Sequence, residues 1–378
     1  MNPGGEALGS NRRAAPATST EPAEPSPGRG RRAVRILVSV GLVALMFSYM
    51  LGQLSDLSEV RTAIGAMTSI EMVTLLALAM WNLITYWLVM VAVTPGLTYP
   101  QAAVLTESST AVANTVPGGS PIALGLTYAM LGSWGFSRSR STLAVVVSGV
   151  WNNFAKLGLP VLSLALLALQ GTASTGRVAA GLVGMLTLAA SLLALSLILR
   201  RESFARRAGE GAGRLASMVR RIVKKGPAEG WGDATVKFRG RTIGLIRRSG
   251  LRLTIATVLS HLSLYLVLLV ALRHIGVPER EVGWTEVLAV FSLVRLLTAI
   301  PVTPGGLGVV ELGMIAGLST AGGERSQVVA AVLVYRLLTY VLPIPIGLAT
   351  YVVWRRNRSW LGSAPPLDPS LAPAGDPA

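Results

Sequence analysis

The sequence predicts an all-α polytopic membrane protein with about six full transmembrane helices and two re-entrant hairpins, each broken at a Pro-Gly-Gly triplet. Three observations lead to this prediction. Of the 378 residues, 51% are hydrophobic and only 14% are charged. The hydrophobic residues gather in runs long enough to cross a hydrocarbon layer, which is about 30 Å thick. The basic residues lie mainly between these runs, where they orient a membrane protein.

The N-terminal residues 1–33 are rich in Pro, Gly, Ser and Arg, and we predict a disordered basic cytoplasmic tail. The first apolar run, Val34–Leu54, is long for a signal peptide and lacks a cleavage site of small residues. It is therefore predicted to be an uncleaved first span. At the other end, residues 356–378 form a second disordered tail. The transmembrane domain is expected to cover residues 34–355.

Five further apolar runs are long enough to be full spans. They are predicted at Ile70–Thr94, Thr142–Leu169, Arg177–Leu199, Leu251–Leu272 and Gln327–Trp354.

Two pairs of shorter apolar pieces, in residues 100–134 and 284–318, are each interrupted by a Pro-Gly-Gly triplet. A piece of ~16 residues rises only about 24 Å, which is short for a full crossing. We therefore predict a re-entrant hairpin for each pair, with two short crossings as the alternative. The triplets themselves are Pro117-Gly118-Gly119 and Pro304-Gly305-Gly306.

The longest polar segment, residues 200–250, is a predicted cytoplasmic loop with 14 basic and four acidic residues. Within it Leu215, Met218 and Ile222 fall on one helical face. This pattern suits a helix lying on anionic lipids of the inner leaflet, and a solvated basic linker remains the alternative.

The positive-inside rule places both termini and the 200–250 loop in the cytoplasm. The first hairpin then enters from the cytoplasm and the second from outside. Two similar hairpin-plus-span units in opposite orientation are typical of the inverted repeats of transporters, whose interrupted helices mark the substrate site.

Charged residues flank the second break. Arg295 precedes it and Glu311 follows it by about eight residues, so the two are expected at similar depth and close enough to pair. Arg336 lies ~15 Å into its span. A charge inside the membrane costs about 2.5–3.5 kcal/mol, so these side chains are expected to face the protein interior. They form either an anion-binding site, with the helix end at Gly306, or a structural ion pair.

The first half offers fewer polar candidates. Glu107 lies in the first hairpin, and Asn152, Asn153 and Lys156 lie in the span that follows it. Asn side chains also hold membrane helices together, so both a role in the pathway and a packing role remain open for the two asparagines.

Small residues recur at a spacing of four in both hairpins. Gly313 and Gly317 have this spacing, as do Gly125 and Ala129. The pattern predicts close packing of neighbouring helices.

The residue inventory argues against an enzyme. The chain has no cysteine and only two histidines, His261 and His274, so no metal site or cofactor is expected. It lacks the H-E-x-x-H and G-x-S-x-G motifs. The aspartates all lie in predicted loops or tails: Asp56, Asp233, Asp368 and Asp376.

The formal charge of +16 raises the question of nucleic-acid binding. Because the basic residues lie between membrane spans, we expect anionic lipids as their partners and no nucleic acid. A homo-oligomer is left open.

The stretch from Pro301 to Glu311, PVTPGGLGVVE, resembles the signature of the flippase-like family, the transmembrane region of bacterial lysylphosphatidylglycerol synthases and their stand-alone relatives. The earlier stretch from Pro117 to Pro121, PGGSP, resembles the first Pro-Gly-Gly element of that family. The resemblance covers roughly residues 34–355. It implies lipid translocation between leaflets in a bacterial inner membrane, with Glu311 and the Pro-Gly-Gly residues carried over directly. The soluble aminoacyl-transferase domain is not expected in this chain.

Three functions follow as hypotheses. The first is a lipid flippase that moves a phospholipid or glycolipid headgroup through a site at the middle of the membrane. The second is a secondary transporter of a small solute, and the third is a membrane scaffold that acts through the basic loop. The candidate substrate-binding residues are Arg295, Pro304, Gly305, Gly306, Glu311, Arg336, Pro117, Gly118, Gly119, Glu107, Asn152, Asn153 and Lys156.

Overall fold

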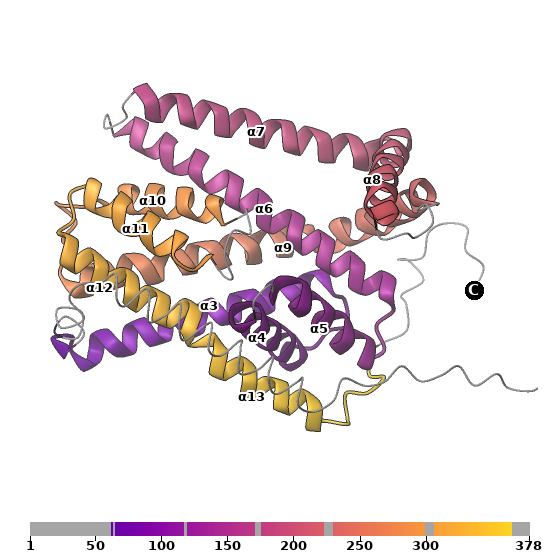
Figure 1. Ribbon diagram of the computed structural model, residues 1–378, viewed down its shortest axis with the longest axis horizontal. Helices are drawn as coiled ribbons and strands as arrows, with labels where there is room; N and C mark the ends of the chain where they lie inside the picture. Colours follow the sequence, from indigo (N-terminus) through magenta and orange to yellow (C-terminus); the bar gives the residue numbers. More distant parts are fainter. Residues whose placement is uncertain are drawn as a thin grey trace, which may run out of the picture. The chain divides into compact units, whose positions relative to one another are not determined.

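A computed structural model describes residue 62 and residues 65–116, 119–170, 175–222, 230–298 and 306–364 of the chain. Regular secondary structure in these residues is entirely helical (Figure 1). The all-α fold class is thereby confirmed. The predicted tail 1–33 and the predicted span Val34–Leu54 lie outside the described residues, as does most of the C-terminal tail.

Within the described residues, five helical segments have the length and composition to cross a membrane. They match the five remaining predicted spans one to one, so this is a multi-pass membrane protein. The segments are α3 (Ser69–Val93), α6 (Arg138–Leu169), α7 (Thr175–Arg200), α9 (Trp231–Ile275), and a continuous run of α12 (Arg325–Arg336), the π-helical η2 (Leu337–Val341) and α13 (Pro343–Arg356).

The two predicted hairpins are pairs of short helices, as the apolar pieces suggested. The first pair is α4 (Tyr99–Thr115) and α5 (Gly119–Ser133), and the second is α10 (Trp284–Leu297) and α11 (Val309–Thr320). Four residues of the two triplets, Pro117, Gly118, Pro304 and Gly305, lie outside the described residues. A re-entrant path through a membrane stays a prediction.

Local sequence signals determine where the helices begin. Thr68 caps α3 and Thr98 caps α4, each by accepting a hydrogen bond from the amide of the third helical residue. That third residue, Glu71 or Gln101, accepts a hydrogen bond from the cap amide in return. These capping boxes satisfy amides that would otherwise lack partners at a helix start.

The helices pack in a reciprocal pattern. α4 of the first hairpin lies along α13 of the last span, while α10 of the second hairpin lies along α6, the span that follows the first hairpin. α3 and α9, which precede the two hairpins, pack along each other. Two units in opposite orientation would produce such reciprocal contacts. The inverted repeat itself stays a prediction.

One end of the bundle holds the start of α3, the end of α6, the end of α9 and the start of α10. The predicted topology places these helix ends outside the cell. His274 at the end of α9 pairs with Glu71 at the start of α3, with 3.5 Å between Nδ1 and Oε1. Thr285 at the start of α10 donates a hydrogen bond of 2.8 Å to Gln170 at the end of α6.

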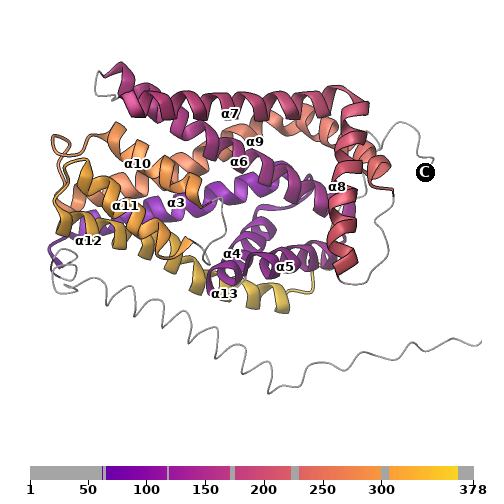
Figure 2. The same ribbon diagram turned by 45° about the horizontal axis from the view of Figure 1, so that its top comes forward.

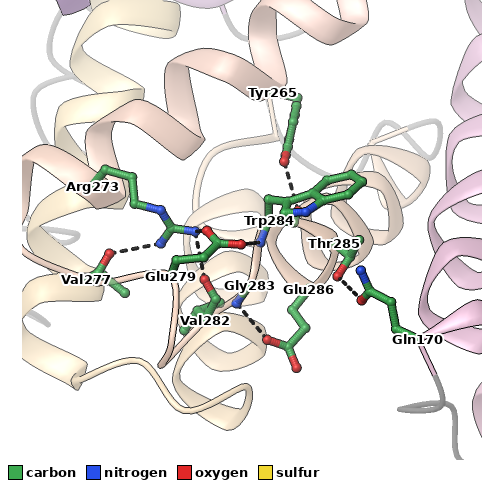
Figure 3. A network of polar contacts seen from close by, with 10 residues as sticks. All are labelled: Gln170, Tyr265, Arg273, Val277, Glu279, Val282, Gly283, Trp284, Thr285 and Glu286. Atoms are coloured by element: carbon green, nitrogen blue, oxygen red, sulfur yellow. Dashed lines mark hydrogen bonds and ion pairs between the residues drawn. The ribbon is translucent and has the colours of Figure 1, made fainter.

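Figure 3 shows a polar network at this end, centred on Arg273. Its guanidinium donates to the carbonyl oxygens of Val277 and Val282, at 2.9 and 2.8 Å, and pairs with Glu279. Glu279 in turn accepts from the amide of Trp284 at 2.9 Å. The network fixes the loop that leads from α9 into the second hairpin.

The opposite end collects the loops predicted to be cytoplasmic. Arg140 near the start of α6 donates to the carbonyl of Pro95, after α3, at 2.7 Å. Trp354 near the end of α13 donates to Ser133 at the end of α5, at 3.0 Å. The grouping of loops therefore agrees with the predicted topology, whereas the side of the membrane on which each end lies stays a prediction.

The basic segment 200–250 is largely helical where the structure describes it, so of the two predicted alternatives the helix agrees with the structure and the linker does not. α8 (Glu202–Ile222) crosses the ends of α7 and α9 (Figure 2), and the first part of α9 covers the rest. With 45 residues, α9 rises roughly 68 Å, which exceeds the membrane thickness. On α8, Leu215 and Met218 are each 68% exposed, as a helix resting on lipid requires.

The close packing predicted from the small residues is found in the second hairpin but not in the first. A Cβ added to Gly313 or Gly317 would lie 2.9 or 2.6 Å from a methyl carbon of Val294 or Val290 on α10. Close packing of α11 on α10 is thereby confirmed. The prediction for Gly125 was wrong in the described structure, because a Cβ there would meet open space.

Candidate functional site

Glu311 and Arg336 form a buried ion pair. Glu311 lies in the first turn of α11, and Arg336 is the last residue of α12. Arg336 Nε donates to Glu311 Oε1 at 2.5 Å, and the two residues are 8% and 3% exposed. The hydrogen-bonded partner of Glu311 is thus Arg336, not the expected Arg295. Glu311 and Arg295 have similar height along their helices, but height does not determine which side chain points toward Glu311.

The helix distorts directly after Arg336. The Leu342 amide donates to the carbonyl of Leu337, five residues back, at 2.8 Å, and Pro343 then begins α13 without an amide donor. This π-helical turn places the ring of Tyr340 4.4 Å from the Arg336 guanidinium carbon. Such cation–π contacts are stabilising when desolvated. π-turns of this kind occur frequently at functional sites.

Asn114 connects the first break to the same turn. It lies in the last turn of α4, and its side-chain amide donates to the Tyr340 carbonyl at 3.1 Å. The Tyr340 hydroxyl donates to the Asn114 carbonyl at 2.6 Å. Two buried hydrogen bonds therefore hold the tip of the first hairpin against the distorted last span.

Lys156 and Arg295 form a second group, which we call the cationic cluster. Lys156 Nζ donates to the hydroxyl of Thr298, the residue that caps the end of α10, at 3.3 Å. Both Lys156 and the buried His261 lie within electrostatic reach of Arg295. Arg295 Nε is buried and has no hydrogen-bond partner among the described residues.

The cationic cluster lacks a countercharge in the described part of the chain. The acidic side chains that form ion pairs there belong to Glu71, Glu202, Asp233, Glu279 and Glu311, and none of them pairs with Lys156 or Arg295. Donor groups without a counterion in a low-dielectric interior are costly. An anion would offset that cost.

Glu107 belongs to a separate environment on α4. It is 1% exposed, and its Oε1 accepts from Trp87 Nε1 at 2.7 Å. Its other oxygen is buried without a partner among the described residues. The structure therefore pairs Glu107 with an indole and gives it no described contact with the cationic cluster.

The glycines of the two triplets that the structure describes have conformational roles. A Cβ on Gly119 would lie 2.5 Å from the carbonyl oxygen of Val112, so only glycine lets α5 begin this close to α4. Gly306 has a φ of +71°, in the left-handed region that favours glycine.

An apolar cavity of about 500 Å³ lies among α6, α7 and α9. Its wall includes Trp151, Phe154 and Leu192, and His261 also lines it. His261 Nδ1 lies 3.0 Å from the Thr257 carbonyl, and its Nε2 is buried without a described partner. His261, which lines the apolar cavity, lies within electrostatic reach of Lys156 and Arg295.

A second cavity, of about 450 Å³, lies among α3, α4, α5, α6 and α9, and we call it the hydroxyl-lined cavity. Asn152 lines it, whereas Asn153 is exposed and lines neither cavity. The sequence analysis missed this cavity. The spacing of Thr106, Ser109 and Thr110, which share one face of α4, is the signal that could have indicated it.

Metal binding finds no support in the described residues, where no group of three or more His, Asp or Glu side chains gathers.

Comparison with known proteins adds two similarities. Residues 32–347 match the family described as the lysylphosphatidylglycerol synthase TM region. The chain is also 40% identical over 62 residues to the UPF0104 membrane protein MJ1078 of Methanocaldococcus jannaschii. That match covers 16% of this chain and 26% of the relative, so it spans about a quarter of the relative's length.

Proposed function

Because this chain belongs to the lysylphosphatidylglycerol synthase transmembrane-region family, we propose that it is a lipid transporter that moves a phosphate-bearing headgroup between the two leaflets. The observation that carries this proposal is the cationic cluster of Lys156 and Arg295, two basic side chains without a carboxylate partner in the described structure.

A lipid phosphate suits the cationic cluster chemically. Guanidinium and ammonium groups are the usual protein ligands of phosphate oxygens. Arg295 Nε still has a hydrogen bond to offer, and a phosphate would also supply the missing negative charge. Arg336 has a different role in this proposal, since Glu311 already neutralises it and the pair holds α11 against α12.

The apolar cavity provides a place for the lipid chains. It lies among three of the candidate spans, and its lining is almost entirely hydrocarbon or aromatic. His261 lines this cavity and lies within electrostatic reach of Lys156 and Arg295. A lipid whose phosphate occupies the cationic cluster could therefore extend a chain into the cavity.

Transport requires that the site be exposed to each leaflet in turn. Two contacts hold the tips of the hairpins, which would have to move for the site to open to the other leaflet. Asn114 joins the tip of the first hairpin to Tyr340, and Thr298 joins the tip of the second hairpin to Lys156. We propose that these contacts part and form again as the hairpins move. We also propose that the protein lies in a bacterial inner membrane with both termini in the cytoplasm.

The test is a scrambling assay. The purified protein is reconstituted into liposomes with a fluorescent anionic phospholipid, and the wild type is compared with Lys156→Gln and Arg295→Gln. Arg355→Gln is the matched control, since Arg355 is exposed at the end of α13. We expect the two cluster variants to lose most of the activity and the control to keep it. Equal rates in protein-containing and empty vesicles would refute the proposal.

A small-solute transporter is the second candidate, and the hydroxyl-lined cavity favours it. Its volume of about 450 Å³ falls within the range of roughly 300–1,000 Å³ that is usual for small-molecule sites. Uptake of a soluble compound into the same liposomes, without movement of labelled lipid, would support this candidate over the first.

A further inference from the structure

The wall of the hydroxyl-lined cavity combines apolar side chains with several hydroxyl groups. Five helices contribute to it, and four of them supply hydroxyl groups from serine or threonine. Six of these residues carry the argument: Thr106, Ser109, Thr110, Thr127, Ser148 and Thr257.

None of the described side chains that line this cavity is charged. A charged ligand would lose its hydration there without gaining a counterion, which is strongly unfavourable in a membrane interior. The wall therefore selects against ammonium, carboxylate and phosphate groups. It suits a ligand that is polar and uncharged.

Several hydroxyl groups have already donated their proton to their own helix. Ser109 donates to the Leu105 carbonyl at 2.7 Å, and Ser148 donates to the Val145 carbonyl at 3.1 Å. A hydroxyl that donates in this way keeps two lone pairs. These oxygens are acceptors within a wall that is otherwise mostly apolar, and they suit a ligand that offers hydrogen-bond donors.

Two of the hydroxyl oxygens are buried and have no hydrogen-bond partner among the described residues. Thr257 is only 3% exposed, and its Oγ1 is buried without a hydrogen bond. Thr106 Oγ1 is also buried without a hydrogen-bond partner. Buried polar atoms in folded proteins nearly always have a partner, so these two groups indicate a missing ligand or water molecules.

The cavity also lies one helical turn from Lys156 of the cationic cluster, and one turn from His261, which is within electrostatic reach of that cluster. On α6, Asn152 lines the cavity and Lys156 follows four residues later. On α9, Thr257 lines the cavity and His261 follows four residues later. Residues four apart lie on one helix face, roughly 6 Å from each other. A ligand of moderate size can therefore reach both places.

We propose that the hydroxyl-lined cavity binds an uncharged polyhydroxylated group, such as a sugar or a cyclitol, that is attached to the phosphate of a lipid headgroup. The inference rests on the proposed lipid transport and names its substrate class. The polyol hydroxyls donate to the serine and threonine oxygens, and Asn152 both donates and accepts. The phosphate contacts Lys156 and Arg295.

Binding to the full chain in lipid nanodiscs tests this proposal, with two anionic probes. Phosphatidylinositol carries a polyol on its phosphate, and phosphatidic acid carries the phosphate alone. We expect wild-type protein to bind phosphatidylinositol more tightly. Thr257→Val, which replaces one hydroxyl by a methyl group, should weaken phosphatidylinositol binding about tenfold. Thr257 also lines the apolar cavity, where a methyl group suits a lipid chain, so phosphatidic acid should bind no more weakly than to the wild type.

Thr320→Val is the matched control, since Thr320 is exposed on α11 and does not line the cavity. It should bind both lipids as the wild type does. Asn152→Leu provides a second cavity variant, so that a folding defect in Thr257→Val does not decide the result. Equal binding of the two lipids by wild type and by both cavity variants would overturn the proposal and leave a water-filled cavity.

A third arm separates this inference from the proposed function. If free inositol binds as tightly as the lipid and Lys156→Gln has no effect, the polyol site is supported and lipid transport is refuted. If Lys156→Gln weakens both lipids while Thr257→Val weakens neither, the phosphate site stands and the polyol site fails.

Discussion

Asn114 and Tyr340 exchange two hydrogen bonds across 226 positions of sequence: the asparagine amide donates to the tyrosine carbonyl, and the tyrosine hydroxyl donates to the asparagine carbonyl. One residue lies at the end of a hairpin helix and the other in a π-helical turn. Each helix has carbonyl groups there that its own backbone does not satisfy. The two hydrogen bonds provide a partner for one backbone carbonyl at each of the two helix interruptions.

Removing the Tyr340 hydroxyl should destabilise the protein. In Tyr340→Phe the Asn114 carbonyl loses its partner while buried, which costs about 1–2 kcal/mol. Thermal unfolding in nanodiscs should show a lower Tm for this variant. Tyr99→Phe is the control, because Tyr99 is 59% exposed and should tolerate the change. An unchanged Tm in Tyr340→Phe would contradict the proposed importance of this contact.

The Glu311–Arg336 pair should behave as a coupled unit. Glu311→Gln or Arg336→Met alone leaves one buried charge without its partner, a loss of about 3–5 kcal/mol. The double variant removes both charges, so it should be less destabilised than the sum of the two single variants. A double-mutant cycle measured by thermal unfolding checks this. Additive losses would indicate that each charge has another partner of equal strength.

Helix contact at Gly347 should exclude any side chain. A Cβ at this position would lie 2.2 Å from the Glu107 carbonyl oxygen and 2.5 Å from the Ala111 methyl group. Gly347→Ala should therefore force α13 away from α4 and cost roughly 1–3 kcal/mol. Gly125→Ala is the matched control, since a Cβ there meets open space and alanine favours the helix by up to about 1 kcal/mol. Equal effects on Tm would show that α4 and α13 do not pack this closely.

Acid should weaken the cap of α12. Hydrogen bonds from Ser326 and from the amide of Gln327 lower the pKa of Glu324 below its ordinary value of about 4.3. The ionised cap therefore stabilises the fold at pH values above 4.3, and that contribution is lost as the pH falls through the lowered pKa. The difference in Tm between wild type and Glu324→Gln should shrink between pH 6 and pH 3. A difference that stays constant would exclude this role of the charge.

The sequence was sufficient to predict the spans and the breaks, because both depend on properties that run along the chain. An apolar run long enough to cross the membrane is visible in the sequence, and a Pro-Gly-Gly triplet interrupts a helix whatever surrounds it. The positions of Arg295, Glu311 and Arg336 along their helices follow from counting residues. The partner of Glu311 did not follow, since counting gives height along a helix and not the direction in which a side chain points.

The extension of α9 over residues 231–250 and the hydroxyl-lined cavity were not predicted from the sequence, for other reasons. The first part of α9 has so many arginines that its apolar face is not apparent from the sequence. On that face Leu245 and Phe238 pack in a hydrophobic cluster. The cavity exists only where five helices meet, and serine or threonine in a single membrane helix more often bonds to its own backbone. The spacing of Thr106, Ser109 and Thr110 indicates a hydroxyl-bearing face of α4, but it does not indicate what that face packs against.

The unbalanced charge of Lys156 and Arg295 has an electrical consequence for the proposed transport. If these cations stay in place while an anionic headgroup crosses, each cycle carries negative charge through the membrane. A potential of 100 mV is worth about 2.3 kcal/mol per elementary charge. In a cell that is negative inside, this force drives the anion outward. The membrane voltage would then give the transporter its direction without a second ion or a nucleotide.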